Sequence, residues 1–104
     1  MTEHDIQNLI RAETADIAVI FRANVGKGIT YDGRYFDTGL PKGFSDLFGF
    51  RKSDGRAVFI EVKSPAGRLR PEQENFIRKM QIYGALAGVA RSVEDARKII
   101  LQED

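Results

Sequence analysis

The chain has 104 residues, of which 42% are hydrophobic and 30% are charged, and its formal net charge is +1. This length and composition predict one globular domain, residues 1–104, with a small hydrophobic core. The absence of cysteine excludes disulfide bonds, zinc–thiolate sites and a cysteine nucleophile, and it fits a cytoplasmic protein. We expect no membrane span and no signal peptide, because no run of residues has the required pattern. With so small a net charge, any nucleic-acid binding would depend on a local basic patch.

The first expected element is a helix over residues 2–15. Thr2 can cap this helix, and acidic side chains in its first turn suit the helix dipole. Glu3 and Gln7 lie four residues apart and flank the apolar stripe of the helix. By composition alone, these two side chains are better explained as a solvated helix start than as part of a site. The stripe consists of Ile6, Leu9 and Ile10.

Two strands are expected in the segment that follows. Residues 17–22 form a short apolar run that predicts the first. The polar segment 22–28 contains two glycines and could place backbone N–H groups and Lys27 against phosphate. A plain connecting turn explains this segment equally well, and it lacks the spacing of a P-loop. We expect residues 29–42 to be irregular, with one short edge strand near 34–37.

A β-hairpin is the central predicted element. A four-residue loop would place Asp46 opposite Glu61, and a two-residue loop would place it opposite Lys63. In either register the three side chains share one face, because side chains of a strand alternate between faces. A three-residue loop would send Asp46 to the other face. The expected segments are the strand 46–51, the turn 52–55 and the strand 56–63.

Both faces of this hairpin carry apolar side chains. The face of the two acids also holds Phe48, Phe50 and Phe59. The opposite face holds Leu47, Val58, Ile60 and Val62. A hairpin that is apolar on both faces predicts helices packed above and below the sheet.

A second helix is expected to begin at Pro71, which occupies the favoured first position. Gln73 begins the apolar stripe of this helix, which continues at Phe76, Ile77 and Met80. The spacing therefore predicts that Gln73 points inward. An inward glutamine at a helix start could equally serve only to satisfy a backbone N–H group.

The chain closes with one more strand and one more helix. Residues 85–91 predict the strand, and Ser92 can cap a helix over 93–102 that has acidic side chains in its first turn. The expected order is α-β-(β)-β-β-α-β-α. This order predicts an α/β sandwich in which a mixed sheet carries helices on both faces.

Two acids and a lysine on one apolar sheet face are a candidate catalytic site. Asp46, Glu61 and the backbone carbonyl of Val62 would form an oxygen donor set suited to Mg²⁺ or Mn²⁺, which can activate water and neutralise phosphate charge. Lys63 could orient the attacking water or stabilise developing negative charge. A buried salt bridge between Lys63 and one acid is the alternative, and these residues alone favour neither interpretation. His4, the only histidine, is better explained as a surface residue.

Basic side chains are frequent around the acids. Arg68 and Arg70 lie just after the lysine strand, where they could hold phosphates that flank a scissile bond. A run of charge is usually a solvated face, but this one borders the acids. Further candidate DNA contacts in the polar segment upstream are Arg22, Asn24 and Lys27. The other basic side chains considered are Arg34, Lys42, Arg51, Lys52, Arg56, Arg78 and Lys79.

Four parts of the sequence resemble the PD-(D/E)XK nucleases and, more narrowly, the VRR-NUC family, in particular its small stand-alone members from phages and prophages. These parts are Gly-Phe-Ser-Asp-Leu at 43–47, Glu-Val-Lys at 61–63, Gly-Arg-Leu at 67–69 and Gln73. A lone Glu-x-Lys would be weak evidence, whereas the four parts at these spacings are strong. Ser45 stands where the superfamily name expects proline, which is a common variation of little chemical weight. The likeness extends to the first helix, to residues 22–26 and to the tail 84–92.

The resemblance implies a restriction-endonuclease-like α-β-β-β-α-β core whose mixed sheet is flanked by helices on both faces. It also implies an Mg²⁺- or Mn²⁺-dependent phosphodiesterase in which Asp46 and Glu61 bind the metal and Lys63 is the catalytic lysine. Gln73 corresponds to the family's glutamine on the helix after the lysine strand. Glu3 corresponds to a helix glutamate that helps to hold the metal, directly or through water.

The resemblance further implies a homodimer that cuts branched DNA such as Holliday junctions. Such a protein would be encoded by a phage or prophage and would act in the cytoplasm of the bacterial host. The same domain attached to larger proteins acts on flaps. The leading hypothesis is therefore a structure-selective DNA endonuclease. The alternatives are a non-catalytic DNA-binding or assembly module on a nuclease fold, which the intact acid–acid–lysine set disfavours, and a flap or nicking endonuclease without junction preference.

Overall fold

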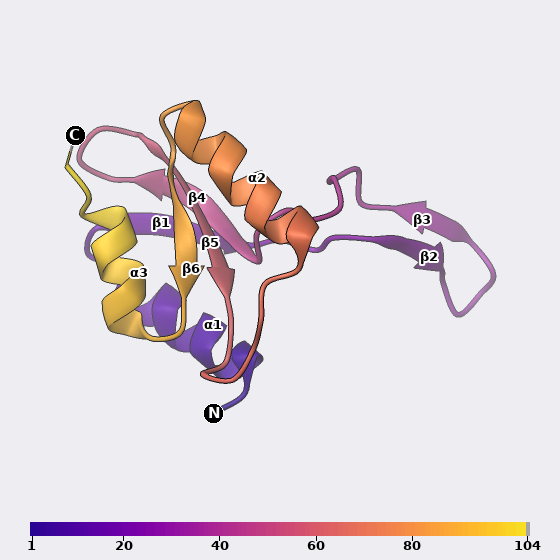
Figure 1. The fold of residues 1–104 in the computed structure, drawn as a ribbon. Helices are drawn as coiled ribbons and strands as arrows, with labels where there is room; N and C mark the ends of the chain where they lie inside the picture. Colours follow the sequence, from indigo (N-terminus) through magenta and orange to yellow (C-terminus); the bar gives the residue numbers. More distant parts are fainter. Residues whose placement is uncertain (104) are drawn as a thin grey trace.

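Figure 1 shows the computed structural model, which describes residues 1–103. The predicted order of elements is confirmed, and one strand, β2, is added to it. In chain order the elements are α1 (Glu3–Glu13), β1 (Ala18–Arg22), β2 (Lys27–Ile29), β3 (Tyr35–Asp37), β4 (Leu47–Arg51), β5 (Ala57–Val62), α2 (Pro71–Ile82), β6 (Leu86–Ala90) and α3 (Val93–Ile100).

The main sheet has four strands in the order β1-β4-β5-β6. The pairs β1–β4 and β4–β5 are antiparallel, and β6 runs parallel to β5 after the α2 crossover. The β1–β4 contact is close, because a Cβ atom added to Gly49 would lie 1.8 Å from the Val19 carbonyl oxygen. The mixed sheet expected from the order of elements is therefore confirmed.

Helices cover both faces of this sheet (Figure 1), as the hairpin pattern predicted. Helices α1 and α3 pack on one face, where Ile10, Ile60 and Ile100 are fully buried. Helix α2 packs on the other, where the Phe59 and Phe76 rings lie 5.5 Å apart. The face of the two acids is thus the face that α2 covers. Within residues 1–103, no helix combines the length and apolar character needed to cross a bilayer.

The central hairpin has the four-residue loop. The Arg51 N–H group donates to the Arg56 carbonyl oxygen at 2.9 Å, and Leu47 pairs with Ile60. Counting one residue outward from that pair places Asp46 opposite Glu61. Of the two registers compatible with a shared face, the structure selects the one that opposes the two carboxylates.

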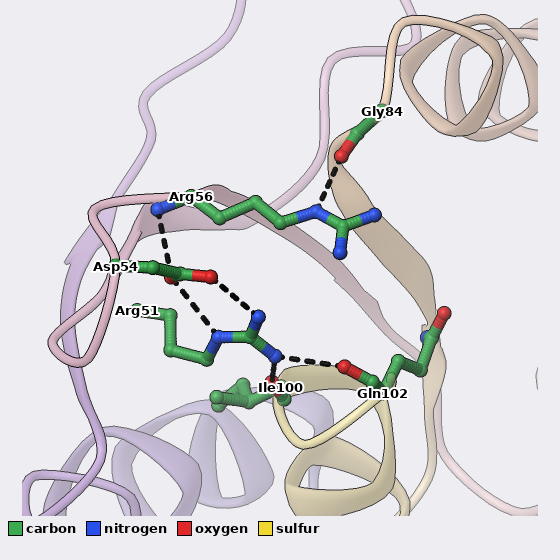
Figure 2. Close-up of polar contacts among 6 residues, drawn as sticks. All are labelled: Arg51, Asp54, Arg56, Gly84, Ile100 and Gln102. Atoms are coloured by element: carbon green, nitrogen blue, oxygen red, sulfur yellow. Dashed lines mark hydrogen bonds and ion pairs between the residues drawn. The ribbon is translucent and has the colours of Figure 1, made fainter. Parts of the chain in front are cut away.

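The turn of this hairpin is held by charged side chains (Figure 2). The Asp54 carboxylate accepts hydrogen bonds from the Arg51 side chain, at 3.1 and 2.6 Å, and from the Arg56 N–H group. Arg51 also donates to the carbonyl oxygens of Ile100, the last residue of α3, and of Gln102, both at 2.8 Å. The turn lies at the far end of β4 and β5 from the acids, about 16 Å away at roughly 3.3 Å per residue. These arginines therefore brace the fold and do not border the acids.

A second, two-stranded sheet projects from the body of the molecule (Figure 1). It pairs Lys27 with Asp37 and Ile29 with Tyr35. The edge strand expected near 34–37 is confirmed as β3, but it pairs with β2 and not with the main sheet. The expectation that residues 22–28 are a loop or plain turn is wrong for Lys27 and Gly28, which lie in β2, and Ile29, expected to be irregular, also lies in β2. Neither of these three-residue strands has a buried residue, so their sequence pattern could not identify both of them.

Candidate active site

Two carboxylates meet at the open end of the hairpin. Glu61 in β5 is only 2% exposed, and half-buried Asp46 precedes β4 directly opposite it. The Val62 N–H group donates to Asp46 Oδ2 at 2.9 Å, which fixes the Asp46 side chain against β5. Burial, followed by the charge and hydrogen bonding of Asp46, raises the pKa of Glu61 to about 8, while the Lys63 charge opposes this rise. Two acids in contact within an apolar sheet require a proton or a cation between them.

Gln73 connects this pair to the start of α2. Its side chain is 5% exposed and points inward, as the spacing predicted. Its Nε2 atom donates to Glu61 Oε1 at 2.9 Å, and its Oε1 atom accepts the Arg70 N–H group at 2.9 Å. The two interpretations of an inward glutamine therefore hold together. Gln73 satisfies a backbone N–H group at the helix start and also orients the buried carboxylate.

The donor set fits a hard divalent cation. Glu61 Oε1 accepts the hydrogen bond from Gln73, whereas Glu61 Oε2 is buried with no hydrogen-bond partner in the described chain. Carboxylate oxygens are preferred ligands of Mg²⁺ and Mn²⁺, and Mg²⁺ usually keeps several waters. No group of three or more acidic or histidine side chains is gathered for metal binding among residues 1–103. A cation between Asp46 and Glu61 would therefore rely on water and backbone oxygens for its remaining ligands, and the Val62 carbonyl stays the predicted backbone ligand.

The segment before β4 is shaped to deliver Asp46. Gly43 has φ +92°, and a Cβ atom there would lie 2.4 Å from the Glu72 carbonyl oxygen, so only glycine allows this approach to α2. The Phe44 ring packs 4.9 Å from that of Phe76 in α2. Ser45 is fully buried, and its Oγ atom has no hydrogen-bond partner in the part of the chain described. These contacts clamp the segment onto the helix that also carries Gln73.

Lys63 follows β5 directly. Its N–H group donates to the Ala90 carbonyl oxygen at 3.1 Å, which extends the pairing of β5 with β6. Its half-buried side chain passes the Cα atom of Gly67, and its charge acts on Glu61. Within residues 1–103, Lys63 forms no ion pair with either acid. The alternative of a buried salt bridge between Lys63 and one of the two acids is therefore not found in the described chain.

Glu3 approaches the segment that follows Lys63 from the first turn of α1. Its Oε2 atom lies 3.5 Å from the Ser64 N–H group and close to Gly67. Glu3 is not gathered with Asp46 and Glu61 into one donor cluster, so a contribution to a metal would pass through water. The role of Glu3 stays a prediction.

An open groove of about 1330 Å³ runs over the acids. Its lining includes Asp46, Glu61 and Gln73 together with three of the predicted DNA contacts, Asn24, Lys27 and Arg70. Arg22, Arg68, Lys63 and Glu3 lie outside this lining. Arg22 instead places Nη1 3.3 Å from His4 Nδ1 on the exposed side of α1.

The groove has a wall that sequence reasoning missed. It consists of residues 36–42, which run from the end of β3 toward β4 and reach α2, where Lys42 Nζ lies 4.0 Å from Glu72 Oε1. Most of this segment was expected to be irregular. The sequence feature that could have pointed to a functional wall was the group of aromatic residues near it, Tyr31, Tyr35 and Phe36. The wall closes the groove on the side of the projecting sheet.

Comparisons with known proteins agree with this geometry. A model of the VRR-NUC domain family matches residues 6–94. Among solved structures, a protein described as a VRR_NUC domain superposes with a TM-score of 0.66 at 20% identity, over 100% of each chain. No curated protein sequence matches the chain. The structural likeness supports the shared fold, and the family match covers the acids, the lysine and Gln73.

Proposed function

The chain belongs to the VRR-NUC domain family, and we propose that it is an Mg²⁺- or Mn²⁺-dependent endonuclease that cuts branched DNA such as Holliday junctions. The family implies a nuclease-like fold and DNA as the substrate. The observation that carries the proposal is the buried pair of Asp46 and Glu61, with an unpartnered carboxylate oxygen, on the floor of an open groove. A buried carboxylate oxygen without a hydrogen-bond partner costs stability, so its presence favours a catalytic role over a non-catalytic module.

In this proposal Asp46, Glu61 and the Val62 carbonyl would hold the metal, with Glu3 contributing through water. The metal would supply a Lewis acid and a water of lowered pKa. Lys63 orients the attacking water or stabilises negative charge on the phosphate. Gln73 keeps Glu61 Oε1 in place through its 2.9 Å hydrogen bond.

Phosphate contacts would come from both sides of the acids. Arg70 lines the groove beside Gln73, Lys27 lines it from β2 of the projecting sheet, and Asn24 lines it from the connection between β1 and β2. Arg68 and Arg22 are exposed outside the groove lining, where they would reach phosphates farther along the strand. Side chains on several elements would therefore hold the DNA backbone across the acids.

The proposal of junction selectivity and dimerisation rests on the resemblance of the sequence to small stand-alone VRR-NUC proteins. A homodimer with a two-fold axis would present two active sites to two strands of a four-way junction. The host cytoplasm would be the place of action. A flap or nicking endonuclease without junction preference is the alternative that uses the same site.

The test uses purified protein with Mg²⁺ or Mn²⁺ and labelled four-way, flap and linear DNA. We expect preferential cutting of the four-way junction, abolished by chelation of the metal. Glu61→Gln and Lys63→Ala should each lower the cleavage rate by about a hundredfold or more, because each removes a group that acts on the transition state. Glu103→Gln, at an exposed residue after α3, is the matched control and should retain activity.

Each alternative has its own outcome in this test. Equal cutting of linear duplex and junction would remove junction selectivity and leave a general endonuclease. Preferential cutting of flaps would favour the flap endonuclease. No cutting of any substrate, combined with undiminished DNA binding by Lys63→Ala, would favour the non-catalytic module.

A further inference from the structure

Residues 26–38, here called the arm, form a preformed hairpin that stands away from the body of the molecule (Figure 1). At its base, the Gly26 N–H group donates to Thr38 Oγ1 at 3.1 Å, and the Thr38 N–H group donates to the Gly26 carbonyl oxygen at 3.0 Å. At its tip, the Arg34 N–H group donates to Thr30 Oγ1 at 2.9 Å. The arm is therefore a closed two-stranded ribbon and not an irregular loop.

The arm presents large side chains that nothing in the described chain covers. Ile29 is 73% exposed, Tyr35 is 68% exposed and Tyr31 at the tip is fully exposed. The arm contributes no residue to the buried core. An isolated two-stranded hairpin is marginally stable in water, so a ribbon with these exposed side chains is expected to bind a partner.

The position of the arm points to DNA as that partner. Lys27 of β2 and Phe36 of β3 line the same groove as Asp46 and Glu61, so the arm continues the wall of the candidate active site. DNA seated over the acids would lie against the base of the arm. A major groove admits a two-stranded β-ribbon, and apolar or aromatic side chains on a ribbon can contact thymine methyl groups or stack on unpaired bases.

The charges of the arm indicate which part of DNA it meets. Lys27 and Arg34 are balanced by Asp32 and Asp37, so the arm has no excess of positive charge to attract phosphates. Arg34 also lies 3.4 Å from Asp32, which neutralises the tip. A neutral ribbon with exposed aromatic side chains suits base edges better than the phosphate backbone.

We propose that the arm enters a groove of the DNA beside the scissile phosphate and contacts bases through Ile29, Tyr31 and Tyr35. The inference rests on the proposed nuclease function and assigns base contact to a separate element. Phosphates are then held by Arg70, Asn24 and, at the base of the arm, Lys27, while the outer part of the arm senses the shape or opening of the duplex. A branch point, where bases are unstacked and a groove is widened, offers the ribbon the best access.

The test compares the wild-type protein with a Tyr31→Ser/Tyr35→Ser double variant. Binding to a labelled four-way junction and to linear duplex is measured by fluorescence anisotropy in Ca²⁺ over a series of salt concentrations. The matched control is Tyr83→Ser, an 82% exposed tyrosine at the far end of α2. Thermal unfolding should be the same in all three proteins, because the substituted side chains are on the surface. Light scattering measures the mass of each protein, so that a change of oligomeric state is detected.

We expect the double variant to lose about tenfold or more in junction affinity, with the salt dependence of binding and the mass unchanged. Tyr83→Ser should bind like the wild type. Affinity of the double variant within about twofold of the wild type overturns the inference. A double variant that has a lower mass in solution but binds the junction with unchanged affinity per subunit also overturns the inference. The arm would then contact a second copy of the chain. If the wild-type protein binds neither the four-way junction nor the linear duplex, the proposed nuclease function fails as well. Failure of the inference alone is therefore distinguishable from failure of the proposed function.

Discussion

Glu61 is the residue at which electrostatics and fold conflict most strongly. It is 2% exposed near the end of β5 in an apolar sheet and lies opposite Asp46, and its second carboxylate oxygen has no hydrogen-bond partner in the described chain. Gln73 donates a neutral hydrogen bond to its first carboxylate oxygen at 2.9 Å. Such an arrangement is unfavourable for folding alone and favourable for holding a cation.

The raised pKa of Glu61 predicts how stability depends on pH. The pKa rises from an ordinary value of 4.5 to about 8 in the folded protein, so between these values the folded state binds a proton that the unfolded state has released. Without divalent cation, the free energy of unfolding should therefore fall as pH rises from about 4.5 to about 8. Chemical denaturation at several pH values measures this slope. Glu61→Gln should flatten it and Glu103→Gln should not, whereas a slope that survives in Glu61→Gln would refute the assignment.

The same residue predicts the response to metal. If a cation binds between Asp46 and Glu61, Mn²⁺ or Mg²⁺ should raise the melting temperature of the wild-type protein at pH 8, because a ligand that binds only the folded state stabilises it. Glu61→Gln should lose this increase, because it removes one carboxylate ligand. Differential scanning calorimetry with and without Mn²⁺ measures the shift. An equal shift in both proteins would place the metal elsewhere.

At the scale of elements, Arg91 connects the end of β6 to the segment that carries Lys63 and Arg68. Its Nη1 atom donates to the carbonyl oxygens of Ser64, at 2.6 Å, and Gly67, at 2.7 Å. The same segment approaches Glu3. One arginine therefore holds the backbone between the predicted catalytic lysine and the predicted phosphate contact.

Arg91→Ala should loosen this segment and lower the cleavage rate. Loss of the two charge-assisted hydrogen bonds should cost about 2 kcal/mol of stability. Hydrogen exchange should increase in residues 64–70 more than in β5, and Arg91→Lys should restore protection in part. Arg11→Ala, at an exposed arginine of α1, is the control. Unchanged exchange in residues 64–70 of the alanine variant would contradict this role.

At the scale of the whole molecule, the active-site groove lies between a rigid sandwich and the arm. The sandwich supplies the acids, Lys63 and Gln73 from strands and a helix that pack on one core. The arm contributes no residue to that core as described, and its Lys27 and Phe36 also line the groove. A substrate bound there would contact both the sandwich and the arm.

The proposed homodimer gives a prediction at this scale. In solution the protein should have twice the 11.7 kDa mass of one chain, measured by light scattering coupled to gel filtration. On a four-way junction it should cut two strands within one encounter, because two sites act on one bound molecule. A supercoiled cruciform plasmid distinguishes the outcomes, since paired cuts give linear product and independent cuts give nicked circles first. A monomer at working concentration would contradict the dimer.

Local sequence pattern determined most of the sandwich. Alternation in the hairpin placed Asp46 and Glu61 on one face, Pro71 and Ser92 marked helix starts, and the order of elements predicted the mixed sheet. These features depend on neighbours close in the sequence, so side-chain periodicity and capping were sufficient.

Tertiary structure decided what local pattern could not. Loop length left two registers open, and the backbone pairing of Arg51 with Arg56 selected the one that opposes the acids. The basic residues were close in sequence, but folding sent Arg51 and Arg56 to the hairpin turn and only Arg70, Lys27 and Lys42 to the groove. The arm has no buried face, so no hydrophobic period marked β2. Contacts between distant segments determine these features, and a single sequence encodes them only through the complete packing of the chain.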